Sequence, residues 1–165
     1  MNIKKKLDEY LKLYLEPKKH FAGAFLKKIN FESESFACED AIPINNYIED
    51  NKEEDTFQTK LFKLIDERGL KDSDVYNKVN IDRRLFSKIR SNKDYHPSKD
   101  TIILLGIALE LDESGIEDLL KTASYFLPMN TTYDLIIRFC FKEHIYDLNK
   151  INEFLYDHNC KLLNE

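Results

Sequence analysis

Apolar residues recur at intervals of three and four positions along most of this chain. In the first fifteen residues they are Ile3, Leu7, Tyr10, Leu11, Tyr14 and Leu15, and the same spacing returns in the segments that follow. Such spacing lines one face of a helix, whereas a half-buried strand alternates at every second residue. Glycine and proline number only four each, so few positions interrupt the helices. The pattern predicts an all-α fold.

The same pattern divides the chain into four parts. Residues 1–31 are predicted to form an N-terminal helical hairpin, whose first helix ends at Pro17. Residues 32–55 hold nine acidic residues against one lysine and lack a helical period, which predicts an acidic linker. Helical signals are dense over 56–127, and two more amphipathic helices are predicted in a C-terminal extension, 128–165.

In the third part, residues with particular backbone preferences mark the first helix boundaries. Gly69 is placed to end the first helix in a left-handed conformation, and Asp72 or Ser73 is placed to cap the second. Asn80 tolerates the left-handed turn that would separate the second helix from the third.

The third helix is predicted over Arg83–Ser91, with Asp82 as its cap. Pro97 and Ser98 would open a fourth helix, which is apolar nearly all round and is expected to form the buried centre; a fifth follows Asp112. The residues expected to be largely buried in this part are Leu64, Val75, Ile81, Phe86, Ile89, Leu104, Leu105, Ala108 and Leu119.

The segment LKDSDVYNKVNIDRRLFSKIRSN, residues 70–92, resembles the helix-turn-helix of Cro/C1-type (XRE-like) regulators. Its continuation PSKDTIILLGIALELDESGIEDLL resembles the fourth and fifth helices of that family. The resemblance implies a five-helix Cro/C1 repressor-like domain, with the other amphipathic helices added on its N- and C-terminal sides. It also implies binding to double-stranded DNA, with the third helix in the major groove.

This resemblance implies that side chains in and after the third helix face DNA. Arg83 and Arg84 are suited to bidentate contacts with guanine, whereas the lysines and the last arginine are suited to phosphates. The residues expected at the DNA are Arg83, Arg84, Ser87, Lys88, Arg90, Ser91, Lys93 and Lys99.

Charge is distributed unevenly along the chain. A net charge of −5 excludes a protein that coats nucleic acid along its whole surface, because phosphate repels an acidic body. Between Asp82 and Asp100, however, six basic residues stand against three acidic ones, a local charge of +3 that leaves about −8 for the remainder. This asymmetry is typical of a confined phosphate-contacting face.

Three residues of the second helix differ from the family pattern. Asp72 stands where the family often places glutamine, and Asp74 adds a second carboxylate that would repel phosphate. Tyr76 stands where a small residue is preferred. Its size predicts either a ring that turns outward or a wider separation of the second and third helices.

Residues 56–163 also resemble a module at the C-terminal end of bacterial multidomain proteins, some of which carry ADP-ribose-binding macro domains. The matching pieces include FKLIDERGLKDSDVY, YDLIIRF and IYDLNKINEFL. A module that occurs after different N-terminal domains implies a shared recognition role, which need not be transcription.

No catalytic motif, metal site or cofactor site is visible in the sequence. The histidines are far apart and lack an HExxH spacing, and the cysteines are widely spaced and odd in number, which predicts reduced thiols. They are His20, His96, His144 and His158, and Cys38, Cys140 and Cys160. No apolar run approaches the roughly 18 residues of a membrane helix, which predicts a cytoplasmic protein without a membrane partner.

Two functions follow from this reading. One is a sequence-specific DNA-binding regulator, in which the extra helices at both ends build a homodimer or hold a partner protein. The other is a non-catalytic protein-interaction adaptor in a bacterial signalling or defence complex, with Tyr10, Tyr14 and Phe25 as candidate contacts to a partner or a second copy. Exposure of Arg83, Arg84 and Lys88 together on one convex ridge would favour DNA, whereas engagement of these three residues by Asp72, Asp74 or the acidic linker would favour the adaptor.

Overall fold

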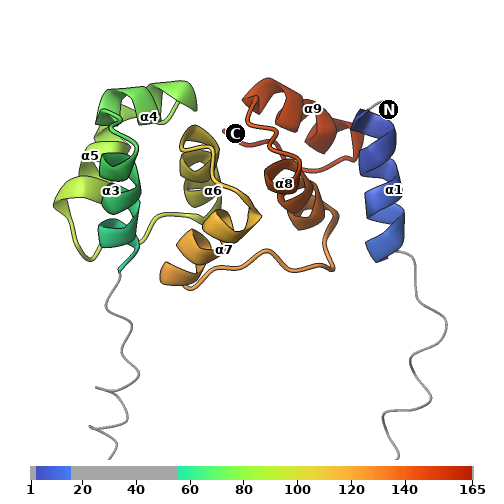
Figure 1. Cartoon of the computed structure of the whole chain (residues 1–165), viewed down its shortest axis with the longest axis horizontal. Coiled ribbons are helices and arrows are strands. Elements are labelled where there is room, and N and C mark those ends of the chain that lie inside the picture. Colours follow the sequence, from blue (N-terminus) through green and yellow to red (C-terminus); the bar gives the residue numbers. More distant parts are fainter. Residues whose placement is uncertain (1–2, 16–55, 165) are drawn as a thin grey trace, which may run out of the picture. The chain divides into compact units, whose positions relative to one another are not determined.

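The computed structural model describes residues 3–15 and 56–164, and all regular structure in these two ranges is helical. The all-α prediction is therefore confirmed for this part of the chain (Figure 1). The predicted second helix of the N-terminal hairpin, which includes Phe25, and the predicted acidic linker lie outside the described residues. The eight described helices are α1 (Ile3–Leu15), α3 (Phe57–Glu67), α4 (Asp72–Lys78), α5 (Arg83–Ser91), α6 (Lys99–Ala108), α7 (Glu113–Thr122), α8 (Thr132–Lys142) and α9 (Leu148–Asp157).

Side-chain caps explain where most of these helices begin. In each case an oxygen of the capping residue accepts a hydrogen bond from a backbone N–H of the first turn, which would otherwise lack a partner. The caps are Thr56 for α3, Asp82 for α5, Ser98 for α6, Asp112 for α7, Thr131 for α8 and Asp147 for α9. The predicted cap Asp82 is confirmed, and α6 and α7 begin directly after Ser98 and Asp112, as predicted.

Helix α4 begins differently from the prediction. Its N-cap is Lys71, and Asp72 and Ser73 are already inside the helix. The Asp74 carboxylate accepts a hydrogen bond from the Lys71 backbone N–H at 3.2 Å. The capping carboxylate is therefore that of Asp74, the third residue of the helix, which stands two residues after Asp72.

Left-handed residues separate successive helices from α3 to α9, except between α5 and α6. Gly69 has φ of 62° after α3, and Asn80 has φ of 54° between α4 and α5, as predicted. The same conformation occurs after α6, α7 and α8 at Glu110, Ser124 and His144. The left-handed conformation is sterically unfavourable for these three residues, so their identities alone do not predict those turns.

Two helices are surrounded by others. Every residue of α6 from Thr101 to Ala108 is buried, and α6 packs against α4 and α7. Helix α8 buries seven of its residues and packs against α1, α7 and α9. The first central helix was predicted from its apolar composition; the second was predicted only as an amphipathic extension. Residues 56–127 and the extension therefore share one compact unit with α1.

The predicted core is confirmed except at one position. Eight of the nine residues are buried, among them Phe86 at 2% exposure and Ile89 at 1%. Leu64 is only half-buried, so its expected burial is wrong. The buried stripe of α3 consists of Phe57, Leu61 and Ile65, spaced four residues apart, and Leu64 falls at its edge.

In the part of the chain that the structure describes, no helix combines the length and apolar character that crossing a membrane requires.

Candidate nucleic-acid interface

Helix α5 packs against the core with one face and exposes the opposite face to solvent. Phe86 and Ile89 are buried on its inner side, and the Asp82 carboxylate accepts the Arg84 backbone N–H at 2.6 Å. Helical spacing places the opposite residues on one continuous face. These exposed residues are Arg83, Arg84, Ser87, Lys88 and Ser91. The structure thus brings together five of the eight residues predicted at DNA.

Three aromatic rings join the helices that support α5. The Phe86 ring lies 6.1 Å from the Phe62 ring of α3, nearly perpendicular to it, and 5.6 Å from the Tyr76 ring of α4. Tyr76 is half-buried rather than turned outward. The ring at the position where the family prefers a small residue is therefore part of the contact between α4 and α5.

A hollow of about 340 Å³ lies on the surface between α4 and α5. Its apolar wall is formed by Tyr76 and Phe86, and its polar wall combines three cations with one carboxylate and two hydroxyls. The polar residues are Lys71, Asp72, Ser73, Arg83, Ser87 and Arg90. This hollow marks one edge of the exposed α5 face.

The cations around α5 differ in how they are engaged. Arg83, Arg84 and Lys93 are exposed, and within residues 3–15 and 56–164 their side chains make no ion pair. The Lys88 ammonium lies 4.5 Å from the centre of the Tyr95 ring, a cation–π distance. All four charges remain at the surface.

Arg90 is engaged on two sides. Its guanidinium donates to the Asp72 carboxylate at 2.5 Å and lies 4.0 Å from the centre of the Phe62 ring. The predicted phosphate contact of Arg90 thus competes with an internal ion pair. Asp72 accordingly engages Arg90 and leaves Arg83 and Arg84 without that partner.

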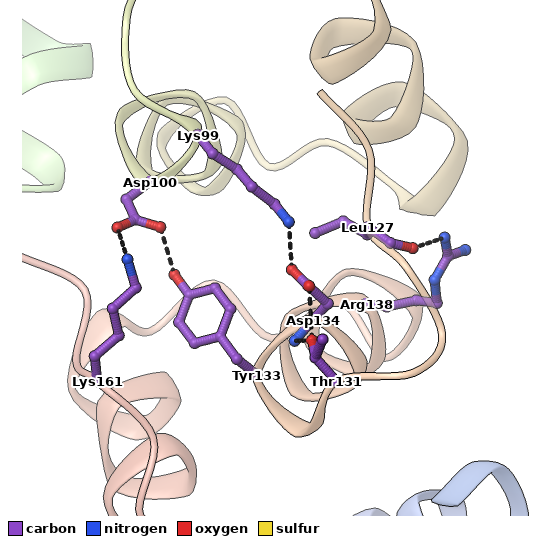
Figure 2. Close-up of polar contacts among 8 residues, drawn as sticks. All are labelled: Lys99, Asp100, Leu127, Thr131, Tyr133, Asp134, Arg138 and Lys161. Carbon is purple, nitrogen blue, oxygen red and sulfur yellow. Dashed lines mark hydrogen bonds and ion pairs between the residues drawn. The ribbon is translucent and has the colours of Figure 1, made fainter. Parts of the chain in front are cut away.

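Lys99 belongs to a different cluster from the α5 cations. Its ammonium donates to the Asp134 carboxylate at 2.6 Å (Figure 2), and Asp134 is only 5% exposed. Asp134 also accepts the Thr131 hydroxyl at 2.7 Å. The predicted phosphate contact of Lys99 thus competes with an internal pair, in which its charge compensates a buried carboxylate whose burial without a partner would be costly.

Next to this pair, Asp100 ties α6 to two more segments. It accepts the Tyr133 hydroxyl at 2.8 Å and the Lys161 ammonium at 2.5 Å, as Figure 2 shows. Burial and then the bond to Asp100 raise the pKa of the Tyr133 phenol far above its usual value. Further along the same segment, the Asn164 side chain donates to the carbonyl of Val79, at the end of α4. These contacts hold the residues after α9 against α6 and the end of α4.

We expect Asp134→Ala to lower the free energy of unfolding by about 1 to 3 kcal/mol, because it leaves the Lys99 ammonium and the Thr131 hydroxyl without their acceptor. Urea denaturation monitored by circular dichroism would measure the loss. Lys161→Ala is the matched control: this lysine is 62% exposed, and its removal should cost less than about 1 kcal/mol. Equal effects of the two variants would contradict the buried role of Asp134.

The predicted partner contacts on α1 face the same chain. Tyr10 is half-buried, and its ring centre lies 5.4 Å from that of Phe139 on α8 and 4.8 Å from that of Tyr14. Burial raises the pKa of the Tyr10 phenol to about 12. The exposed apolar side chains of α1 are instead Leu13 and Leu15.

The thiols of Cys140 and Cys160 are shielded by burial, and the loop residue His96 contacts another part of the chain. Burial raises the pKa of the Cys140 thiol to about 12 and that of Cys160 in the same direction, which disfavours the reactive thiolate. His96 donates to the Ala123 carbonyl at 2.8 Å, and its ring lies 5.2 Å from that of Tyr125. Within the described ranges, no group of three or more His, Cys, Asp or Glu residues could hold a metal ion.

Sequence reasoning missed the two clusters that engage Arg90 and Lys99. Asp72 was recognised as a residue unfavourable to phosphate, but not as the partner of Arg90. Asp134 stands three residues after Thr131, and this spacing could have suggested a helix start but not an ion pair with α6.

No family model, no curated protein and no solved structure matches this chain.

Proposed function

We propose that this protein is a sequence-specific DNA-binding regulator that presents α5 to the major groove. In this proposal α4, the turn at Asn80 and α5 are the helix-turn-helix of a Cro/C1 repressor-like domain built from α3 to α7. The observation that carries it is the exposed face of α5, on which Arg83, Arg84 and Lys88 stand together. A helix with an exposed basic face and a buried apolar face is suited to enter a groove lined by phosphates.

The state of the nearby carboxylates supports the proposal. Asp72 pairs with Arg90, Asp74 accepts the Lys71 N–H, and Asp82 accepts the Arg84 N–H. None of these bonds ties up the guanidinium of Arg83 or Arg84. Asp72 and Asp74, which by sequence are unfavourable to phosphate, thus form hydrogen bonds with other groups of the protein.

The residues of the face would then divide the work of recognition. Arg83 and Arg84, at the start of α5, would read base edges, and Ser87 and Ser91 lie beside them on the same exposed face. Lys88 and Lys93 would meet phosphates, which hold the protein in register without reading sequence. Lys99 has no part in this proposal, because it neutralises Asp134.

The first test is a titration with a pool of random and genomic-fragment duplexes, from which a preferred site is selected. Arg83→Ala and Arg84→Ala should each weaken the selected site by about 1 to 3 kcal/mol and relax the base preference. Lys93→Ala should weaken all duplexes alike and reduce the salt slope by roughly one unit. Lys12→Ala, which removes an exposed cation from α1, is the control and should leave binding unchanged.

A protein-interaction adaptor is the second candidate. The observation that favours it is the loop after α7, where Phe126 is 71% exposed and Met129 is 47% exposed. Exposed aromatic residues are frequent anchors of protein interfaces. If the wild-type chain binds no duplex at low salt, and a protein partner survives high salt and is lost in Phe126→Ala, the adaptor replaces the regulator.

A further inference from the structure

Asp72 and Arg90 form an ion pair at the edge of the exposed α5 face. They are 18 residues apart in the sequence, and their facing atoms lie 2.5 Å from each other. Both side chains are partly open to solvent, with exposures of 36% and 49%. The pair lines the same hollow as Arg83 and Ser87, so it adjoins the residues proposed to meet DNA.

The position of Arg90 depends on two contacts of different kinds. The Arg90 guanidinium lies 4.0 Å from the centre of the Phe62 ring, and it donates one hydrogen bond to the Asp72 carboxylate. The aromatic contact holds the side chain in place but leaves its charge uncancelled. Among residues 3–15 and 56–164, Asp72 is the one carboxylate that forms an ion pair with Arg90.

This arrangement has a direct consequence for binding to a phosphate backbone. A cation that neutralises a phosphate releases counterions. Each such contact makes the logarithm of affinity fall more steeply with the logarithm of salt concentration, by about 0.9 in the slope. An arginine already neutralised by a carboxylate adds little, and the carboxylate itself repels phosphate.

We propose that Asp72 is a positioning residue that withholds Arg90 from the DNA backbone and thereby limits sequence-independent affinity. The inference rests on the proposed DNA-binding function and deepens it. Asp72 acts through Arg90 and reads no base, so its effect is the same for specific and random duplexes. A chain with this restraint depends more on its base contacts for tight binding.

The structure indicates that removing the charge of Asp72 is mild for folding. Asp72 is the first residue of α4, and the backbone cap of that helix comes from Asp74. Asparagine keeps the shape of the side chain, and Arg90 retains its contact with Phe62. Because a misfolded variant would bind DNA less tightly, a gain in affinity cannot arise from unfolding.

The test compares the full chain with Asp72→Asn, Arg90→Ala and the double variant, titrated with a random-sequence duplex over a range of salt concentrations. Asp72→Asn should bind about 3- to 10-fold more tightly at low salt, with a salt slope steeper by about one unit. Arg90→Ala should keep the wild-type slope, and the double variant should return to it. Asp157→Asn, which makes the same charge change on α9, is the matched control and should leave the slope unchanged.

The outcomes separate this inference from the proposed function. Wild-type binding to duplexes with no gain in Asp72→Asn would overturn the inference and leave the function standing. An equal gain in Asp157→Asn would assign the effect to net charge and would also overturn it. A steep slope retained by the double variant, whose net charge equals that of the wild type, would show that the effect does not act through Arg90 and would overturn it as well. Absence of any wild-type binding at low salt would overturn both.

Discussion

Replacing Phe86 with alanine is expected to lower the free energy of unfolding by about 3 to 5 kcal/mol. The side chain is 2% exposed and lies between the rings of Phe62 and Tyr76, so its removal leaves a cavity where α3, α4 and α5 meet. A loss of this size is a large share of the stability of an ordinary domain. Thermal and urea denaturation followed by circular dichroism would measure it.

Phe126→Ala provides the matched control, because it removes the same side chain from a position that is 71% exposed. This change should alter the stability by no more than about 0.5 kcal/mol. A Phe86 variant that unfolds at the wild-type midpoint would mean that the register assigned to α5 is wrong.

Phe139→Ala is expected to cost a similar amount, about 3 to 5 kcal/mol. Phe139 is 1% exposed in the centre of α8 and contacts Tyr10 of α1. Helix α8 also packs against α7, and the Asp134–Lys99 pair ties it to α6. We therefore expect this variant to destabilise α3 to α7 together with α8, in one cooperative transition.

Two probes follow the two regions separately. Reaction of the buried Cys140 thiol reports the opening of α8, and amide hydrogen exchange reports the opening of α5 and α6. Both should shift together in Phe139→Ala. If α8 opens early while α5 and α6 keep their wild-type protection, residues 128–165 form a separate extension, as the sequence predicted.

Much of the local structure could be predicted because it depends on neighbours in the chain. The bounds of α5, its cap at Asp82 and the left-handed turn at Asn80 follow from preferences that act over a few residues. The burial of Phe86 follows from helical spacing. The exposed face of α5 follows from the same spacing, since the residues between buried ones must face outward.

The sequence by itself therefore determined the all-α class of the described part, most helix boundaries and the basic residues that share a helical face. Tertiary packing alone decided which basic side chains form ion pairs within the protein and which remain unpaired at the described surface. It paired Arg90 with Asp72 and Lys99 with Asp134, over separations of 18 and 35 residues, and placed Tyr10 against Phe139. The physical reason is that helix spacing is set by covalent geometry, whereas an ion pair depends on how two helices pack, which local preferences do not encode.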